Sequence, residues 1–107
     1  MADQIALIRE AARHMRERAQ SAQPGPWHIG NAVDPTQLCN IHTFPQSSGV
    51  ADGLRWLDAE YIASWHPGVA LAVADLLQVL SRMPSIAHAA DLDAAQRVAR
   101  AYLGRSR

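Results

Sequence analysis

The Pro-Gly-Pro run at 24–26 constrains the fold of this 107-residue chain more than any other feature. Before it, apolar residues recur at steps of three and four, which is the period of an amphipathic helix. Two prolines around a glycine cannot continue that helix. The sequence therefore predicts a first helix over about 4–20, capped by Asp3, that ends near Ser21.

The segment after this break has the pattern of β-structure. Ile41 and Thr43 are β-branched and alternate with polar residues, and the turn signal Asp34-Pro35 precedes them. We expect two short strands, over about 27–33 and 37–44, followed by a loop at 45–49. Because a lone hairpin is marginal in water, these strands must pack on helices or on a second chain.

Two helical patterns follow the predicted strands. Asp52 is a suitable N-cap for a second helix over about 53–65. Pro67 disfavours the helical conformation at the residue before it and suits the first turn of a third helix, over about 67–82. The residues expected to face inward are Leu54, Leu57, Tyr61, Ile62 and Trp65 in the second helix, and Val69, Val73, Leu76, Leu77 and Leu80 in the third.

A fourth helix is expected over about 91–103, started by Asp91 or Asp93 and ended by Gly104. Its inner face is predicted to be Leu92, Ala95, Val98, Ala99 and Tyr102. The chain is long enough for one core and not for two. The sequence therefore predicts an α+β fold: one domain over 1–107, with four helices, a short antiparallel hairpin or small sheet between the first two, and a frayed tail at 105–107.

Composition excludes several classes of protein. Ten basic residues balance ten acidic ones, whereas a general nucleic-acid binder is expected to be basic. Cys39 is the single cysteine, which excludes an intramolecular disulfide and a four-cysteine zinc site within one chain. No signal peptide is visible, and the longest apolar stretch, 69–74, is far shorter than the roughly 20 residues that cross a bilayer. We expect a soluble, cytoplasmic protein with no membrane partner.

The side chains that carry chemistry are few. His28, Cys39, His42 and His66 form a conceivable zinc set, but Cys39 and His42 would point to opposite faces of an extended strand. A nucleophilic Cys–His pair needs an orienting third group, which the sequence does not supply. There is no glycine-rich phosphate loop and no nucleophile elbow. The favoured interpretation is a protein without catalytic residues, cofactor or metal, with a buried Cys39 and surface histidines.

Two features indicate partner binding. An exposed Trp beside an Arg is typical of an interface anchor, and Trp56 follows Arg55 while lying off the predicted apolar face. The first helix also carries a local basic stripe, blunted by neighbouring glutamates. The predicted partner-binding residues are Trp56, Arg55, Arg9, Arg13 and Arg16.

Two blocks of the chain resemble a known family. Residues 16–27 run from a helix into Pro-Gly-Pro-Trp, and residues 58–71 read Asp-Ala-Glu-Tyr-Ile-Ala, a short gap, a proline and an apolar helix. Together they are similar to the Ead-like accessory proteins of temperate phages and their relatives in actinobacterial phages. The family's usual Thr before Pro-Gly-Pro-Trp is Gln23 here, and its usual Asn before the later proline is His66. The resemblance covers about 10–80.

This resemblance implies a phage-encoded, non-structural accessory protein, and it implies no established reaction, cofactor or catalytic residue. We therefore expect a protein that binds and modulates a host protein without catalysis. The alternatives are a nucleic-acid-binding regulator that uses the arginine face of the first helix, and a Cys/His zinc module. A homodimer is also expected, because several apolar residues exceed what four short helices cover: Leu77, Leu80, Met83, Val98 and Tyr102.

Overall fold

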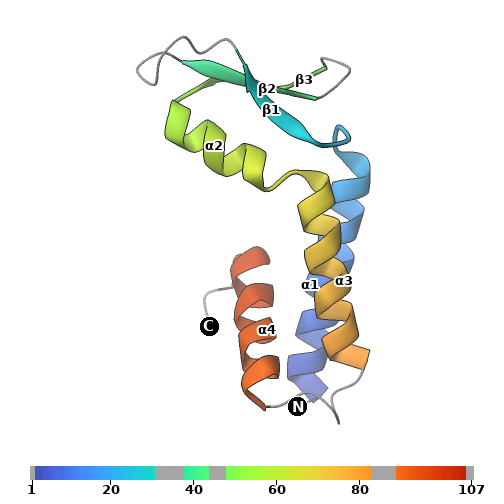
Figure 1. Ribbon diagram of the computed structural model, residues 1–107. Coiled ribbons are helices and arrows are strands. Elements are labelled where there is room, and N and C mark those ends of the chain that lie inside the picture. The colour runs from blue at the N-terminus through green and yellow to red at the C-terminus, as the bar shows by residue number, and fades with distance from the viewer. Residues whose placement is uncertain (1, 31–37, 44–47, 83–88, 106–107) are drawn as a thin grey trace. The chain divides into compact units, whose positions relative to one another are not determined.

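The computed structural model describes residues 2–30, 38–43, 48–82 and 89–105 (Figure 1). These residues form four helices and three strands, which confirms the predicted α+β class. In chain order the elements are α1 (Ala2–Ser21), β1 (Trp27–Gly30), β2 (Cys39–Thr43), β3 (Gly49–Leu54), α2 (Trp56–Ser64), α3 (Pro67–Arg82) and α4 (Ala89–Tyr102).

The contacts group the chain into two compact units. Residues 1–17 and 71–107 form one, which we call the helical unit, and residues 18–70 form the other, which we call the sheet unit. The single domain expected over 1–107 stays a prediction.

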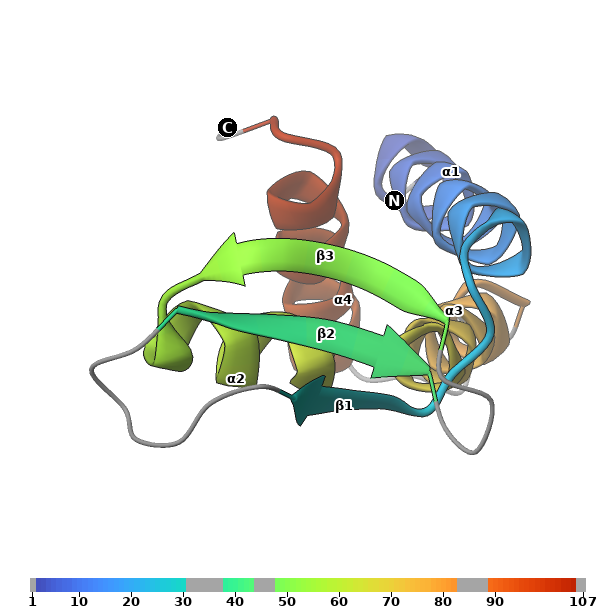
Figure 2. The ribbon, with the colours of Figure 1, turned by 90° about the horizontal axis from the view of Figure 1, so that it is seen from above.

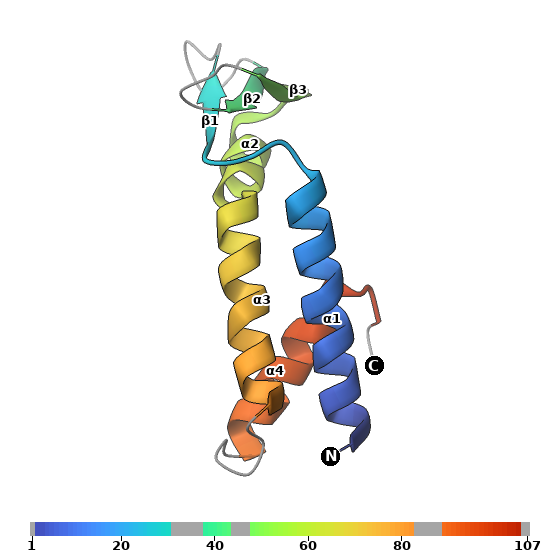
Figure 3. The same ribbon diagram turned by 90° about the vertical axis from the view of Figure 1, so that its right-hand side faces the viewer.

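The helical unit is built on closely packed alanines. Within it α1 and α3 run side by side in opposite directions, and α4 packs against both (Figure 3). Alanines make up more than half of the buried cluster, and small side chains let helix axes approach closely. The cluster consists of Ile8, Ala11, Ala12, Met15, Ala74, Leu77, Leu92, Ala95 and Ala99.

Several expectations about these helices are wrong. The fourth helix begins at Ala89, so Asp91 and Asp93 lie inside it and do not start it. Asp3 lies inside the first turn of α1 rather than at its cap, where its charge interacts favourably with the positive end of the helix. Leu76 is 58% exposed and Val98 is 41% exposed, although both were expected to face inward. Leu77 is buried as expected, and the other buried positions of α3 are Pro67, Ala70, Ala74 and Ser81. Steps of four and three connect these positions as well, and small residues occupy most of them.

The end of α4 confirms the role predicted for Gly104. This glycine has a φ of 73°, its N–H donates to the carbonyl of Ala101, and the Arg105 N–H donates to the carbonyl of Arg100. This pair of bonds is the Schellman arrangement, which satisfies carbonyls at the helix end. The helix ends at Tyr102, one residue before the expected end at 103.

Arg105, the first residue of the expected frayed tail, makes an ion pair with Glu10, and the fraying itself stays a prediction. Its guanidinium makes two bonds to the carboxylate of Glu10, at 2.8 and 2.9 Å. The hydrogen bond from Arg105 lowers the pKa of Glu10, and the same bond raises the pKa of Arg105. Residues 106–107 lie outside the described residues.

The sheet unit contains an antiparallel sheet in the order β1-β2-β3, with α2 against one face (Figure 2). Ile29 pairs with Ile41 between β1 and β2, which confirms the predicted hairpin. The expected strand residues 31–33, 37 and 44 lie outside the described residues. Burial alternates along β2, and the core on the helix side contains the fully buried Cys39, Ile41 and Ala59.

The third strand, β3, is not among the elements predicted from the sequence. Residues 49–54 pair with β2, so Asp52 lies in a strand and does not cap a helix. The pairing shifts register between Cys39 and Ile41, where Gly53 has a φ of 67°. A glycine in this left-handed conformation is a common means of placing an extra residue in a strand. As a result α2 begins at Trp56, three residues later than expected.

The predicted break between the second and third helices is confirmed. The second helix, α2, ends at Ser64, and α3 begins at Pro67. Between them His66 accepts a hydrogen bond at its Nδ1 from the backbone N–H of Gly68, at 3.2 Å. His66 therefore acts as an N-cap, satisfying one of the free N–H groups of the first turn of α3.

Candidate partner-binding surface

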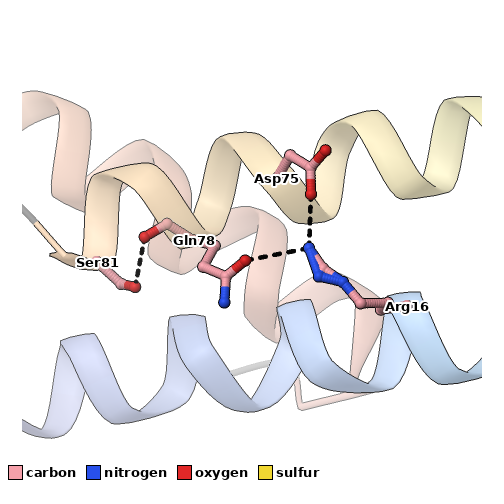
Figure 4. Close-up of polar contacts among 4 residues, drawn as sticks. All are labelled: Arg16, Asp75, Gln78 and Ser81. Atoms are coloured by element: carbon pink, nitrogen blue, oxygen red, sulfur yellow. Dashed lines mark hydrogen bonds and ion pairs between the residues drawn. The ribbon is translucent and has the colours of Figure 1, made fainter.

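The arginines of α1 that were predicted to bind a partner are engaged within the helical unit. Arg16 donates from one nitrogen to Asp75 at 2.6 Å and to Gln78 at 3.1 Å (Figure 4). Both acceptors lie on α3, so the guanidinium bridges two successive turns of that helix. Its side chain is only 28% exposed. Arg16 therefore joins two helices of the core.

Arg9 makes a second contact between α1 and α3, near the end of α3. Its Nη2 donates to the carbonyl of Ser81 at 3.2 Å, and its Nε lies 3.4 Å from the Ser81 hydroxyl. Ser81 is fully buried and its hydroxyl donates to the carbonyl of Gln78. Carbonyls in the last turn of a helix have no partner within the helix, so Arg9 satisfies one that α3 leaves open.

Arg13 pairs with Glu17 one turn along α1, at 3.2 Å, as the spacing predicts. Each of the three arginines in the predicted basic stripe thus has an acceptor inside the protein. A surface that binds phosphates needs guanidinium groups directed at the ligand. The contacts of Arg9 and Arg16 direct them to α3 instead.

The prediction that Trp56 lies off the apolar face of its helix is wrong. Trp56 is partly buried and packs with Ile62 and Ala63 against the core between α2 and the sheet. Its neighbour Arg55 precedes the helix and donates to Asp58 at 3.0 Å, with its own side chain largely exposed. Only Arg55 of this predicted pair is therefore on the surface, and it is already part of an ion pair.

The outer face of α2 carries the side chains that were expected inside. Leu57 and Tyr61 are each 78% exposed, and Trp65, just beyond the end of the helix, is 39% exposed. These three residues, which we call the α2 outer face, follow one another at steps of four and so lie on one side of the helix. The sequence shows their spacing, but the expectation that this side of the helix faces the core is wrong.

The histidines and the cysteine do not form one cluster. Cys39 is buried on the helix side of the sheet, with its Sγ 3.3 Å from the Leu54 carbonyl. His28 and His42 pair across β1 and β2 with their ring centroids 6.4 Å apart. His66 is the cap of α3. Within the described ranges, no three His, Cys, Asp or Glu side chains are grouped closely enough to hold a metal ion.

The apolar residues that led us to expect a homodimer are largely used within the helical unit. Leu77 is buried, and Leu80 and Tyr102 pack against the same core. Val98 is partly exposed, and Met83 lies outside the described residues. The homodimer stays a prediction, but its original basis is removed.

Comparisons with known proteins add no relative: the sequence matches no protein-family model, and neither a curated protein nor a solved structure matches it significantly. Among the described residues, no single helix has the length and hydropathy to cross a membrane. The consecutive helices α2 and α3 meet those criteria only when taken together, and they are bent by 48° at the break between them.

Proposed function

We propose that this protein is a phage-encoded accessory protein that binds and modulates a host protein without catalysis, and that it docks through the α2 outer face. The observation that carries the proposal is the exposure of Leu57 and Tyr61, each 78% exposed, beside Trp65. The resemblance to phage accessory proteins supplies the host context, and its second block, residues 58–71, contains two of these three residues.

Local packing gives no reason for these side chains to be large and apolar. The inner side of α2 is filled by Ala59, which is fully buried, and by the partly buried Trp56 and Ile62. Polar residues on the outer side would leave that packing unchanged. Aromatic anchors with an aliphatic neighbour are typical of the residues that contribute most to binding, and spacing at successive turns suits an apolar groove.

The charges beside the α2 outer face favour a basic partner. At 100° per residue, Asp58 and Glu60 flank the line of Leu57 and Tyr61 on opposite sides, and both are exposed. Arg55 offsets the charge of Asp58. Pairing with a second copy would bring like charges together along the edges of the contact, whether the helices ran parallel or antiparallel. We therefore expect a different protein that presents an apolar groove edged by Lys or Arg.

The alternative of nucleic-acid binding has less support. The three arginines that it requires, Arg9, Arg13 and Arg16, all have acceptors within the protein. If the protein nevertheless retained duplex DNA, the affinity would fall with salt with a logarithmic slope of about 0.9 per phosphate contact. A salt titration of DNA retention therefore distinguishes this alternative.

Site-specific photo-crosslinking tests the proposal. A photoreactive phenylalanine analogue at position 61 is expected to crosslink a discrete protein in an extract of the host cell, whereas the same analogue at the exposed Arg97 of α4 is not. Adding Leu57→Ser to the position-61 variant should abolish the crosslink while leaving the circular dichroism spectrum unchanged. Equal crosslinking from both positions, or a crosslink unaffected by Leu57→Ser, would overturn the proposal, as would a product that is only a second copy of this chain.

A further inference from the structure

The sheet has a polar hollow on the face that is turned away from α2. The alternation along β2 places Asn40 and His42 on this face, because Cys39, Ile41 and Thr43 face the helix. The hollow has a volume of about 620 Å³ and is also lined by Gly30 of β1 and by Gly49 and Asp52 of β3. Figure 2 shows the order of the three strands beneath it. This surface is separate from the α2 outer face.

Glycine on the edge strand permits the close approach of the polar groups. A Cβ at Gly30 would lie 2.8 Å from the imidazole of His42 and 2.9 Å from Oδ1 of Asn40. Both side chains therefore lie directly over the backbone of β1. A Cβ at Gly49 would meet no atom of the described residues within 4 Å, so the hollow is open on the side of β3.

The polar groups of the hollow are mainly acceptors. Nδ1 of His42 lies 3.1 Å from the carbonyl oxygen of Thr43, which can only accept, so this nitrogen carries the proton. In the neutral ring Nε2 is then an acceptor. Oδ1 of Asn40 is buried and has no hydrogen-bond partner among the described residues. Asp52 adds a carboxylate, of which one oxygen accepts from the N–H of Gly53 at 2.8 Å.

We propose that the hollow binds a small cation with several N–H donors, and that the guanidinium group is the best match. It is planar, it presents five N–H groups, and it pairs with carboxylates. Asp52 would supply the charge, while Asn40 and His42 would accept further N–H groups. A rotation about χ2 of Asn40, a soft torsion, turns Oδ1 toward the ligand. An anion is disfavoured, since no Lys or Arg is among the residues that line the hollow.

Two sources could supply this group: a free guanidinium compound, or an arginine side chain of a peptide. Titrations with agmatine and with a blocked Gly-Arg-Gly peptide separate them, and inorganic phosphate serves as the anionic probe. Backbone amide shifts recorded by NMR are expected to move and saturate at Gly30, Asn40, Gly49 and Asp52. Saturation with agmatine alone supports a free ligand, and saturation with the peptide alone supports a side chain; either supports the site.

Charge-neutralising variants make the test specific. Asp52→Asn keeps an acceptor for the Gly53 N–H and should weaken binding about tenfold or more, which corresponds to the loss of a charged hydrogen bond. The matched control Glu60→Gln removes an exposed carboxylate from α2 and should leave the affinity unchanged. The inference is wrong if neither guanidinium probe gives saturable shifts up to about 10 mM. It is equally wrong if phosphate binds there instead, or if both variants have the same effect.

Discussion

The helical unit and the sheet unit use their polar and large apolar residues in opposite ways. In the helical unit, Arg9 and Arg16 on α1 contact α3, and Arg105 pairs with Glu10. In the sheet unit, large apolar side chains lie on the outside of α2, and the opposite face of the sheet carries the acceptor-rich hollow. Arg9 and Arg16 therefore serve the packing of the helical unit, whereas Leu57 and Tyr61 of the sheet unit remain exposed.

The two units also differ in how much they bury. Among the residues that the structure describes, four large side chains of the helical unit are fully or almost fully buried, whereas the sheet unit has one, Ile41, together with Cys39. Burial of apolar area is the dominant favourable term in folding. The comparison predicts that stability is concentrated in the helical unit and that the sheet unit tolerates change on its exposed faces.

Truncation of a buried leucine in the helical unit should have the largest effect. Leu92→Ala removes a side chain that is 2% exposed and leaves a cavity, so it should lower the free energy of unfolding by about 2–5 kcal/mol. The control Val98→Ala, on the same helix, should cost about 1 kcal/mol or less, because that side chain is partly exposed. Urea unfolding followed by circular dichroism measures both, and equal losses would contradict the assigned faces of α4.

Replacing either of the two glycines with positive φ should have a smaller effect on stability. Gly53 lies in the sheet unit and Gly104 in the helical unit. Gly53→Ala and Gly104→Ala should each cost about 1–2 kcal/mol, because alanine is strained in the left-handed conformation. Gly49→Ala is the control, since its Cβ would meet open space and its φ is not positive. If Gly53→Ala were as harmless as this control, the irregular pairing of β2 with β3 would be wrong.

These assignments also show how much of the fold was predictable. Periodicity identified α1, α3 and α4, and the β-branched alternation identified β2, because each pattern is local. The third strand was missed because Gly49–Leu54 contains two glycines and an aspartate and has no alternating β-branched residues. The partners of Arg9 and Arg16 were missed for another reason: they lie 72 and 59 residues away in the chain.

The face of α2 was misassigned because this helix is apolar on two sides. Leu54, Leu57, Tyr61 and Trp65 follow helical steps, and so do Trp56, Ala59 and Ala63; Ile62, also expected inside, does pack against the core. The first set contains more apolar surface, so the sequence favoured it. The third strand determines which side of α2 faces the core. Leu54 belongs to β3, and the helix begins two residues later. The candidate partner-binding surface was therefore present in the sequence but was interpreted as core.

The ion pair of Glu10 with Arg105 should produce a small, pH-dependent effect. The pKa of Glu10 is lowered in the folded protein from its ordinary value of 4.5. The unfolded state therefore binds the proton more readily, so the stabilisation is present above pH 4.5 and is lost as the pH falls through the folded-state pKa. Glu10→Gln should lower stability at neutral pH and have less effect in acid. If the loss of stability caused by Glu10→Gln were the same at every pH, the ion pair of Glu10 with Arg105 would not persist in solution.

The orientation of α2 is the central claim, and one comparison of two aromatic residues on that helix tests it most directly. The measurement is the free energy of unfolding of Trp56→Ala and Tyr61→Ala, each relative to the unmodified protein. Trp56 packs in the core against the sheet, so Trp56→Ala should lower the free energy of unfolding by about 1–3 kcal/mol. Tyr61 is 78% exposed, so Tyr61→Ala should lower it by about 0.5 kcal/mol or less. The opposite order, with Tyr61→Ala the more destabilising, would place the α2 outer face in the core and contradict the account.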